Sequence, residues 1–93
     1  MEMTYRYNKD SIEISEKPME TDFEFEIRLL AEVNWAGMKK VQKFFEEDSV
    51  ITDVLFYAFE KHHYRVIVRK DYYVDFILAL MKQHLIESAE WIS

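Results

Sequence analysis

The chain has 93 residues, of which 49% are hydrophobic and 16% aromatic, and it contains one glycine, one proline and no cysteine. A chain of this length builds one hydrophobic core, and the lack of cysteine excludes disulfides, thiolate metal sites and thiol catalysis. The formal net charge of -6 argues against direct nucleic-acid binding, because phosphate contacts depend on Lys and Arg.

The start of the chain lacks the basic segment and apolar run of a signal peptide. No apolar stretch approaches the ~18 residues that are needed to span a bilayer. An absence of cysteine also fits a reducing compartment. We therefore expect a cytoplasmic protein without membrane contact.

Two short apolar segments begin the chain, at residues 3–7 and 12–14. The four polar residues between them, Asn8-Lys9-Asp10-Ser11, favour a turn, so the sequence predicts an N-terminal β-hairpin. A charged segment with the single proline follows over residues 16–22 and predicts a linker, because proline cannot donate to a central ladder.

Apolar and polar residues then alternate strictly, which predicts a strand over residues 23–33. Asn34 is of a residue type that caps helices, and a helix is predicted over residues 35–47. Four apolar residues recur there at helical spacing: Met38, Val41, Phe44 and Phe45.

Two β-branched and aromatic segments predict strands over residues 51–60 and 63–70, joined by a polar turn. Residues 71–83 are rich in Leu, Ala and Met and long enough to favour a helix. The last segment, residues 85–92, is predicted to be a strand.

From residue 23 the order of elements is β-α-β-β-α-β, which predicts an α+β, ferredoxin-like split β-α-β fold. Four strands would form one antiparallel sheet with both helices on a single face, preceded by the N-terminal hairpin. The whole chain, residues 1–93, would be a single domain, with the hairpin and linker in residues 1–22 and the core in residues 23–93. Many unrelated activities use this topology, so it predicts no function.

Three histidines are candidate metal ligands, because the predicted topology brings His62, His63 and His84 to one end of the sheet, near Asn34 and Trp35. Adjacent strand residues point to opposite faces, which argues against a shared ion. We favour solvated turn residues at His62 and His63, and a helix C-terminal residue at His84. No metal site and no cofactor are predicted.

Catalytic patterns are missing from the sequence. Carboxylate pairs such as Glu24 with Glu26 lack an apolar context that would raise a pKa, and no serine stands in a nucleophile motif. We predict no catalytic residue, which favours a function other than an enzyme.

An acidic run lies in the first third of the chain. Such a face can imitate the phosphates of nucleic acid and block a basic groove, as small phage-type inhibitors do, or it can serve solubility and protect a sheet edge. Its residues are Glu13, Glu16, Glu20, Asp22, Glu24 and Glu26.

An excess of apolar residues is the main functional indication, because monomers seldom leave large apolar patches in water. The open sheet face is predicted to carry Leu30, Leu55, Tyr57, Phe59 and Ile67, and the second helix adds Tyr72 and Leu78. We predict a non-catalytic protein-binding or regulatory module that forms a homodimer through the open sheet face or, if the N-terminal hairpin covers that face, through the second helix. The alternatives are an acidic inhibitor of a nucleic-acid-handling protein and a metal- or small-ligand-binding domain at the histidine end.

Overall fold

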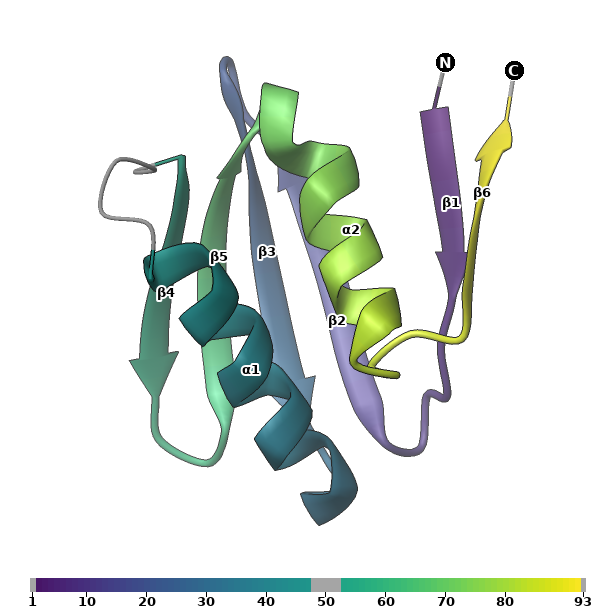
Figure 1. The fold of residues 1–93 in the computed structure, drawn as a ribbon, viewed down its shortest axis with the longest axis vertical. Helices are drawn as coiled ribbons and strands as arrows, with labels where there is room; N and C mark the ends of the chain where they lie inside the picture. The colour runs from purple at the N-terminus through teal and green to yellow at the C-terminus, as the bar shows by residue number, and fades with distance from the viewer. Residues whose placement is uncertain (1, 48–52, 93) are drawn as a thin grey trace.

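The computed structural model describes residues 2–47 and 53–92 (Figure 1). Both helices lie against the same face of a four-stranded antiparallel sheet, and a separate two-stranded ribbon stands beside the second helix. The predicted α+β architecture with two helices and antiparallel strands is confirmed. Within the described residues, no helix has the length and apolar character required to cross a bilayer.

The main sheet has the strand order β2-β3-β5-β4, and the ribbon pairs β1 with β6. The strands are β1 (Glu2–Arg6), β2 (Ile12–Pro18), β3 (Asp22–Leu29), β4 (Val54–Phe59), β5 (His63–Arg69) and β6 (Ser88–Ile92). The helices are α1 (Trp35–Glu46) and α2 (Tyr73–Lys82), preceded by the 3-10 turns Glu32–Asn34 and Lys70–Tyr72. Both predicted helices are therefore present, close to their predicted bounds. The start of the strand predicted over residues 51–60 lies outside the described residues.

The predicted strand pairing is wrong at both ends of the chain. β1 and β2 do not form a hairpin, because β2 pairs with β3 along its whole length, from Ile12 opposite Leu29 to Pro18 opposite Phe23. The last strand, β6, does not join the main sheet and pairs with β1, with Trp91 opposite Met3. β2 thus occupies the place beside β3 that the ferredoxin-like arrangement assigns to the last strand.

A short connection explains this choice of partner. The predicted linker over residues 16–22 is instead the end of β2 and a tight turn, in which the N–H of Met19 donates to the carbonyl of Asp22 at 2.8 Å. Closing a turn of a few residues costs less conformational entropy than returning the chain from the end of α2. β2 therefore takes the edge beside β3, and β6 pairs elsewhere.

β3 ends at Leu29 rather than at residue 33. The N–H groups of Leu30 and Ala31 donate to the carbonyl of Ser11, at 2.9 and 3.1 Å, which turns the chain out of the sheet. Asn34 precedes α1, but its side chain makes no capping hydrogen bond. Its Nδ2 donates to the same carbonyl of Ser11 at 3.0 Å, so Asn34 ties the start of α1 to the β1–β2 connection.

One buried cluster fills the space between the sheet and the helices. Alternate residues of the strands face it, and Phe25 on β3, Val66 on β5 and Phe76 on α2 are completely buried. The rings of Phe25 and Phe76 pack with centroids 4.8 Å apart. Of the predicted α1 stripe, only Phe44 departs, with 63% of its surface exposed. The face of the sheet opposite the helices is left open.

Candidate functional site

The open face of the sheet divides into an apolar and a charged half. β4 supplies the apolar half through Leu55, Tyr57 and Phe59, which are 43%, 49% and 48% exposed. We call these three residues the apolar stripe. On β5 they lie opposite Ile67, Arg65 and His63, respectively. The stripe follows from strand alternation, because Val54 and Phe56, which alternate with these residues, turn toward the core.

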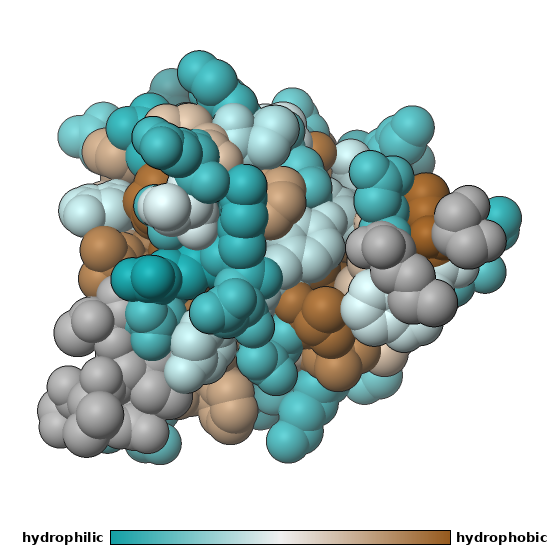
Figure 2. Space-filling model, turned by 90° about the horizontal axis from the view of Figure 1, so that it is seen from above, coloured by the Kyte–Doolittle hydropathy of each residue, from teal (hydrophilic) through white to brown (hydrophobic). Residues whose placement is uncertain are grey.

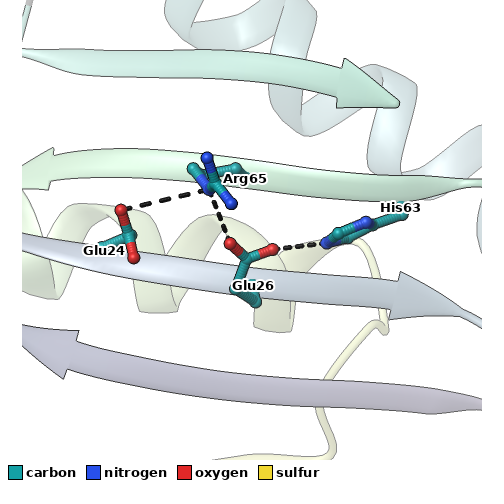
Figure 3. A network of polar contacts seen from close by, with 4 residues as sticks. All are labelled: Glu24, Glu26, His63 and Arg65. Carbon is teal, nitrogen blue, oxygen red and sulfur yellow. Dashed lines mark hydrogen bonds and ion pairs between the residues drawn. The ribbon is translucent and has the colours of Figure 1, made fainter. Parts of the chain in front are cut away.

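The charged half is a cross-strand network of Glu24 and Glu26 on β3 with His63 and Arg65 on β5 (Figure 3). The Nε of Arg65 donates to Glu26 at 2.6 Å and lies 4.0 Å from a carboxylate oxygen of Glu24. The other oxygen of Glu26 contacts the Nε2 of His63. Glu26 thus contacts Arg65 and His63 directly across the strands, and Glu24 lies at the outer limit of an ion pair with Arg65.

The network controls the ionisation of Glu26. Desolvation raises the pKa of this carboxyl, but the hydrogen bonds from Arg65 and His63 outweigh it and hold the pKa below its usual range. Hydrogen bonding to Glu26 also raises the pKa of Arg65. Glu26 is therefore ionised near neutral pH and has no proton to give to a substrate.

Arg65 and Phe59 join the two halves of the open face. The guanidinium carbon of Arg65 lies 5.4 Å from the centroid of the Phe59 ring, within the range of a cation–π contact. The ring of Phe59 is 5.3 Å from that of His63. The charged network thereby positions one end of the apolar stripe.

A second polar cluster lies on the helix-facing side of β2. The hydroxyl of Tyr5 donates to Glu16 at 2.6 Å, and that of Tyr73 lies 3.0 Å from both carboxylate oxygens. Desolvation by burial, together with the nearby Glu16 carboxylate, raises the pKa of Tyr5 and of Tyr73. The Tyr7 hydroxyl also donates to the carbonyl of Ile14 at 3.1 Å. These contacts tie the ribbon to β2 and α2.

A groove of ≈ 620 Å³ runs beside this cluster, between the ribbon and α2. Seen from above, the ribbon forms a lobe beside the main body (Figure 2). The groove is lined by Glu2, Met3, Glu16, Phe23, Lys70, Tyr73, Val74 and Trp91. Glu16 is engaged by two tyrosines, and the Nζ of Lys70 donates to the carbonyl of Glu20 at 3.0 Å. Two of the charged side chains at this groove, Glu16 and Lys70, therefore have structural partners.

The predicted partner-binding residues fall into separate places. The apolar stripe and Ile67 lie together on the open face. Leu30 follows the end of β3 and is 51% exposed, while Tyr72 packs against the core. Leu78 lines a smaller groove of ≈ 240 Å³ between the helices, together with Val41 and Phe44.

The six acidic residues do not share one surface. Glu13, Glu24 and Glu26 lie on strand positions of the open face, whereas Glu16 lies on the helix-facing side. Glu20 is in the β2–β3 turn, and Asp22 begins β3. Because Arg65 contacts both Glu24 and Glu26, these positions do not present a row of free negative charge.

Two of the three histidines occupy left-handed backbone positions, with φ of 56° at His62 and 60° at His84. His62 is not a solvated turn residue, because its ring stacks on Trp35 at 3.8 Å. His63 belongs to β5 and contacts Glu26. In the part of the chain that the structure describes, no three His, Cys, Asp or Glu side chains are placed to hold a metal ion.

Sequence reasoning missed both polar clusters. The charged network had a signal in the sequence. Glu24 and Glu26 alternate on one predicted strand and Arg65 lies on another, and opposite charges on paired strands attract each other. The contacts of Glu16 with Tyr5 and Tyr73 had no such signal, since they depend on where the ribbon packs.

Searches of family models, curated proteins and solved structures find no match to this chain. The geometry of the open face is therefore the basis for proposing a function.

Proposed function

We propose that the protein is a non-catalytic interaction module that self-associates through the apolar stripe on β4. One observation carries the proposal: three large apolar side chains at alternate positions of one edge strand stand half exposed on the open face of the sheet. Contiguous exposed apolar residues of this kind mark interaction surfaces in soluble proteins. Ile67 lies opposite Leu55 and extends the patch from β4 onto the neighbouring strand β5.

A second copy of the chain is a suitable partner because the stripe has no charge. The protein has a net charge of -6, so two copies repel each other at long range, and a contact surface without charge adds nothing to that repulsion. Next to the stripe, Arg65 is already paired with Glu26, which limits the charge left for a neighbour. Two stripes can therefore meet without further repulsion.

The expected affinity is modest. Full burial of a large apolar side chain contributes about 1.5–3 kcal/mol, and half-exposed side chains contribute about half of that. Two stripes then supply roughly 5–9 kcal/mol, which is comparable with the cost of association. We therefore expect a weak, reversible dimer.

A non-catalytic role is supported by the charged network beside the stripe. Glu26 is ionised and engaged by Arg65 and His63, so it is unsuited to act as a proton donor. The two grooves are open, and the half-buried carboxylate at the larger one is occupied by tyrosine hydroxyls. Glu26 and Glu16 are thus committed to structural contacts and do not converge on a ligand.

Sedimentation equilibrium from about 5 to 500 μM tests the proposal on the full chain. Tyr57→Lys places a charge in the stripe and should weaken the dimer at least about tenfold. Phe44→Lys makes the same kind of change on α1, away from the stripe, and should leave the dimer unchanged. A wild-type monomer at about 500 μM, or equal weakening by both variants, would contradict the proposal.

A further inference from the structure

β4 is one of the two edges of the main sheet, and its only partner among the described strands is β5. Its six residues, Val-Leu-Phe-Tyr-Ala-Phe, include no charge, proline or glycine. Natural edge strands usually carry such features because a bare edge can pair with another chain. β4 thus has the composition of a strand that accepts a further strand.

The direction of its free backbone groups follows from the register with β5. The N–H of Arg69 donates to the carbonyl of Asp53 at 2.9 Å, just before the pair of Val54 with Val68. Hydrogen-bonded and non-hydrogen-bonded pairs alternate along antiparallel strands. Leu55, Tyr57 and Phe59 therefore bond to β5, whereas the backbone groups of Val54, Phe56 and Ala58 point to the free edge.

These three outward residues are self-complementary. A twofold axis at Phe56 places Val54 opposite Ala58 of the second copy and Phe56 opposite itself, which uses every outward N–H and C=O of the strand. On the open face, the same register sets Leu55 opposite Tyr57 of the second copy. A shift of the register in either direction leaves outward groups of β4 unpaired.

From this geometry we infer that two copies join edge to edge, with β4 antiparallel to β4 of the second copy and the twofold axis at Phe56. The main sheets of the two copies become one continuous sheet, and the two apolar stripes become one patch on its open face. This inference rests on the proposed self-association and specifies how it occurs. The alternative within that proposal is stacking of two open faces, which leaves the outer edges of β4 free.

Proline at Ala58 separates the two arrangements. Ala58→Pro removes one outward N–H but no side chain of the stripe and no bond to β5, a position where edge strands tolerate proline. Sedimentation equilibrium should show at least about tenfold weaker dimerisation for this variant. The matched control Ala58→Thr keeps the N–H and should stay within about threefold of wild type.

Amide hydrogen exchange measured by NMR gives a second test on the unaltered chain. At about 500 μM the amides of Val54, Phe56 and Ala58 should exchange several-fold more slowly than at about 10 μM, because the free-monomer fraction falls over this range. Those of Leu55, Tyr57 and Phe59 should be protected at both concentrations, because β5 bonds them in the monomer.

The outcomes distinguish the inference from the proposed function. If Tyr57→Lys weakens the dimer but Ala58→Pro and the alternate amides show no effect, the stripe mediates association and the edge-to-edge arrangement is wrong. If the wild-type chain stays monomeric at about 500 μM, both fail. If Ala58→Pro does not fold, the concentration dependence of the three outward amides decides alone.

Discussion

The two edges of the main sheet are protected to different degrees. β2 carries Glu13, Glu16, Lys17 and Pro18, all of which discourage pairing with another strand. β4 carries none of these residue types. Both edge strands contribute buried side chains to the same core, so the two strands differ in their exposed residues rather than in their packing. An edge that is equally well packed but uncharged is suited to a partner strand, which is why we propose β4 as the interaction surface.

The ribbon adds a second layer of protection to β2 alone. The hydroxyls of Tyr5 and Tyr7 on the N-terminal side reach Glu16 and the carbonyl of Ile14, and Tyr73 of α2 reaches Glu16 from the other side. Half-buried hydroxyls that have a charged acceptor make stronger hydrogen bonds than neutral pairs. Three changes should sharpen or break this contrast between the edges.

The largest effect is expected at Glu16. Glu16→Ala leaves the hydroxyls of Tyr5 and Tyr73 without their acceptor and should lower the free energy of unfolding by about 1–3 kcal/mol. Glu13→Ala removes an exposed carboxylate from the same strand and should change it by less than about 0.5 kcal/mol. Urea unfolding measures both, and equal losses would mean that the ribbon is not held through Glu16.

The second largest effect is expected from alkaline pH, which should weaken the contacts between the ribbon and the edge strand β2. The pKa of Tyr5 and that of Tyr73 are raised in the folded protein, so above about pH 10 the unfolded chain loses protons that the folded chain keeps. This contribution to stability is complete below pH 10 and falls as the pH rises, by up to about 1.4 kcal/mol per pH unit for each tyrosine.

Urea unfolding between about pH 9 and 12 measures this slope. The Tyr5→Phe/Tyr73→Phe double variant should have a shallower slope than wild type, because two groups with raised pKa are gone. Tyr57→Phe on the exposed stripe is the matched control and should keep the wild-type slope. Identical slopes for wild type and the double variant would rule out this role of the tyrosine–carboxylate contacts.

The smallest effect is expected at the turn that leads from α2 to β6, the second strand of the ribbon. His84 follows the helix with φ of 60°, its N–H donates to Met81, and the N–H of Leu85 donates to Leu80. Glycine is the usual residue at this position of a helix C-terminus. In urea unfolding, His84→Gly should therefore raise the free energy of unfolding by about 0.5–1 kcal/mol. His84→Ala keeps a Cβ and should give no such gain; a loss of stability in His84→Gly would indicate a contact of the imidazole ring itself.

Much of the secondary structure was predictable from local pattern. The period-two alternation from Phe23 identified β3, and the helical spacing of Met38, Val41 and Phe45 identified α1, because each pattern reports which side of an element is buried. The apolar stripe was predictable for the same reason. Phe44 was not, since its neighbour Phe45 already fills the buried side of the helix.

Strand partners and polar contacts were beyond local pattern. β2 and β6 were both predicted as short strands, and local pattern does not identify which of them lies beside β3. Glu16 and Glu24 belong to the same acidic run, yet one faces the helices and the other the open face. The role of Asn34 as a tie to Ser11 likewise depended on where the β1–β2 connection came to lie.

The sequence by itself determined the two helices, the strand alternation and an uncharged β4, because propensity and periodicity act between residues that are close in the chain. Tertiary structure alone decided that β2 closes one edge, that the ribbon covers it, and that Glu26 meets Arg65 and His63. The first two outcomes depend on the entropy of closing loops, and the third depends on contacts between residues 37 and 39 positions apart, which no local pattern encodes.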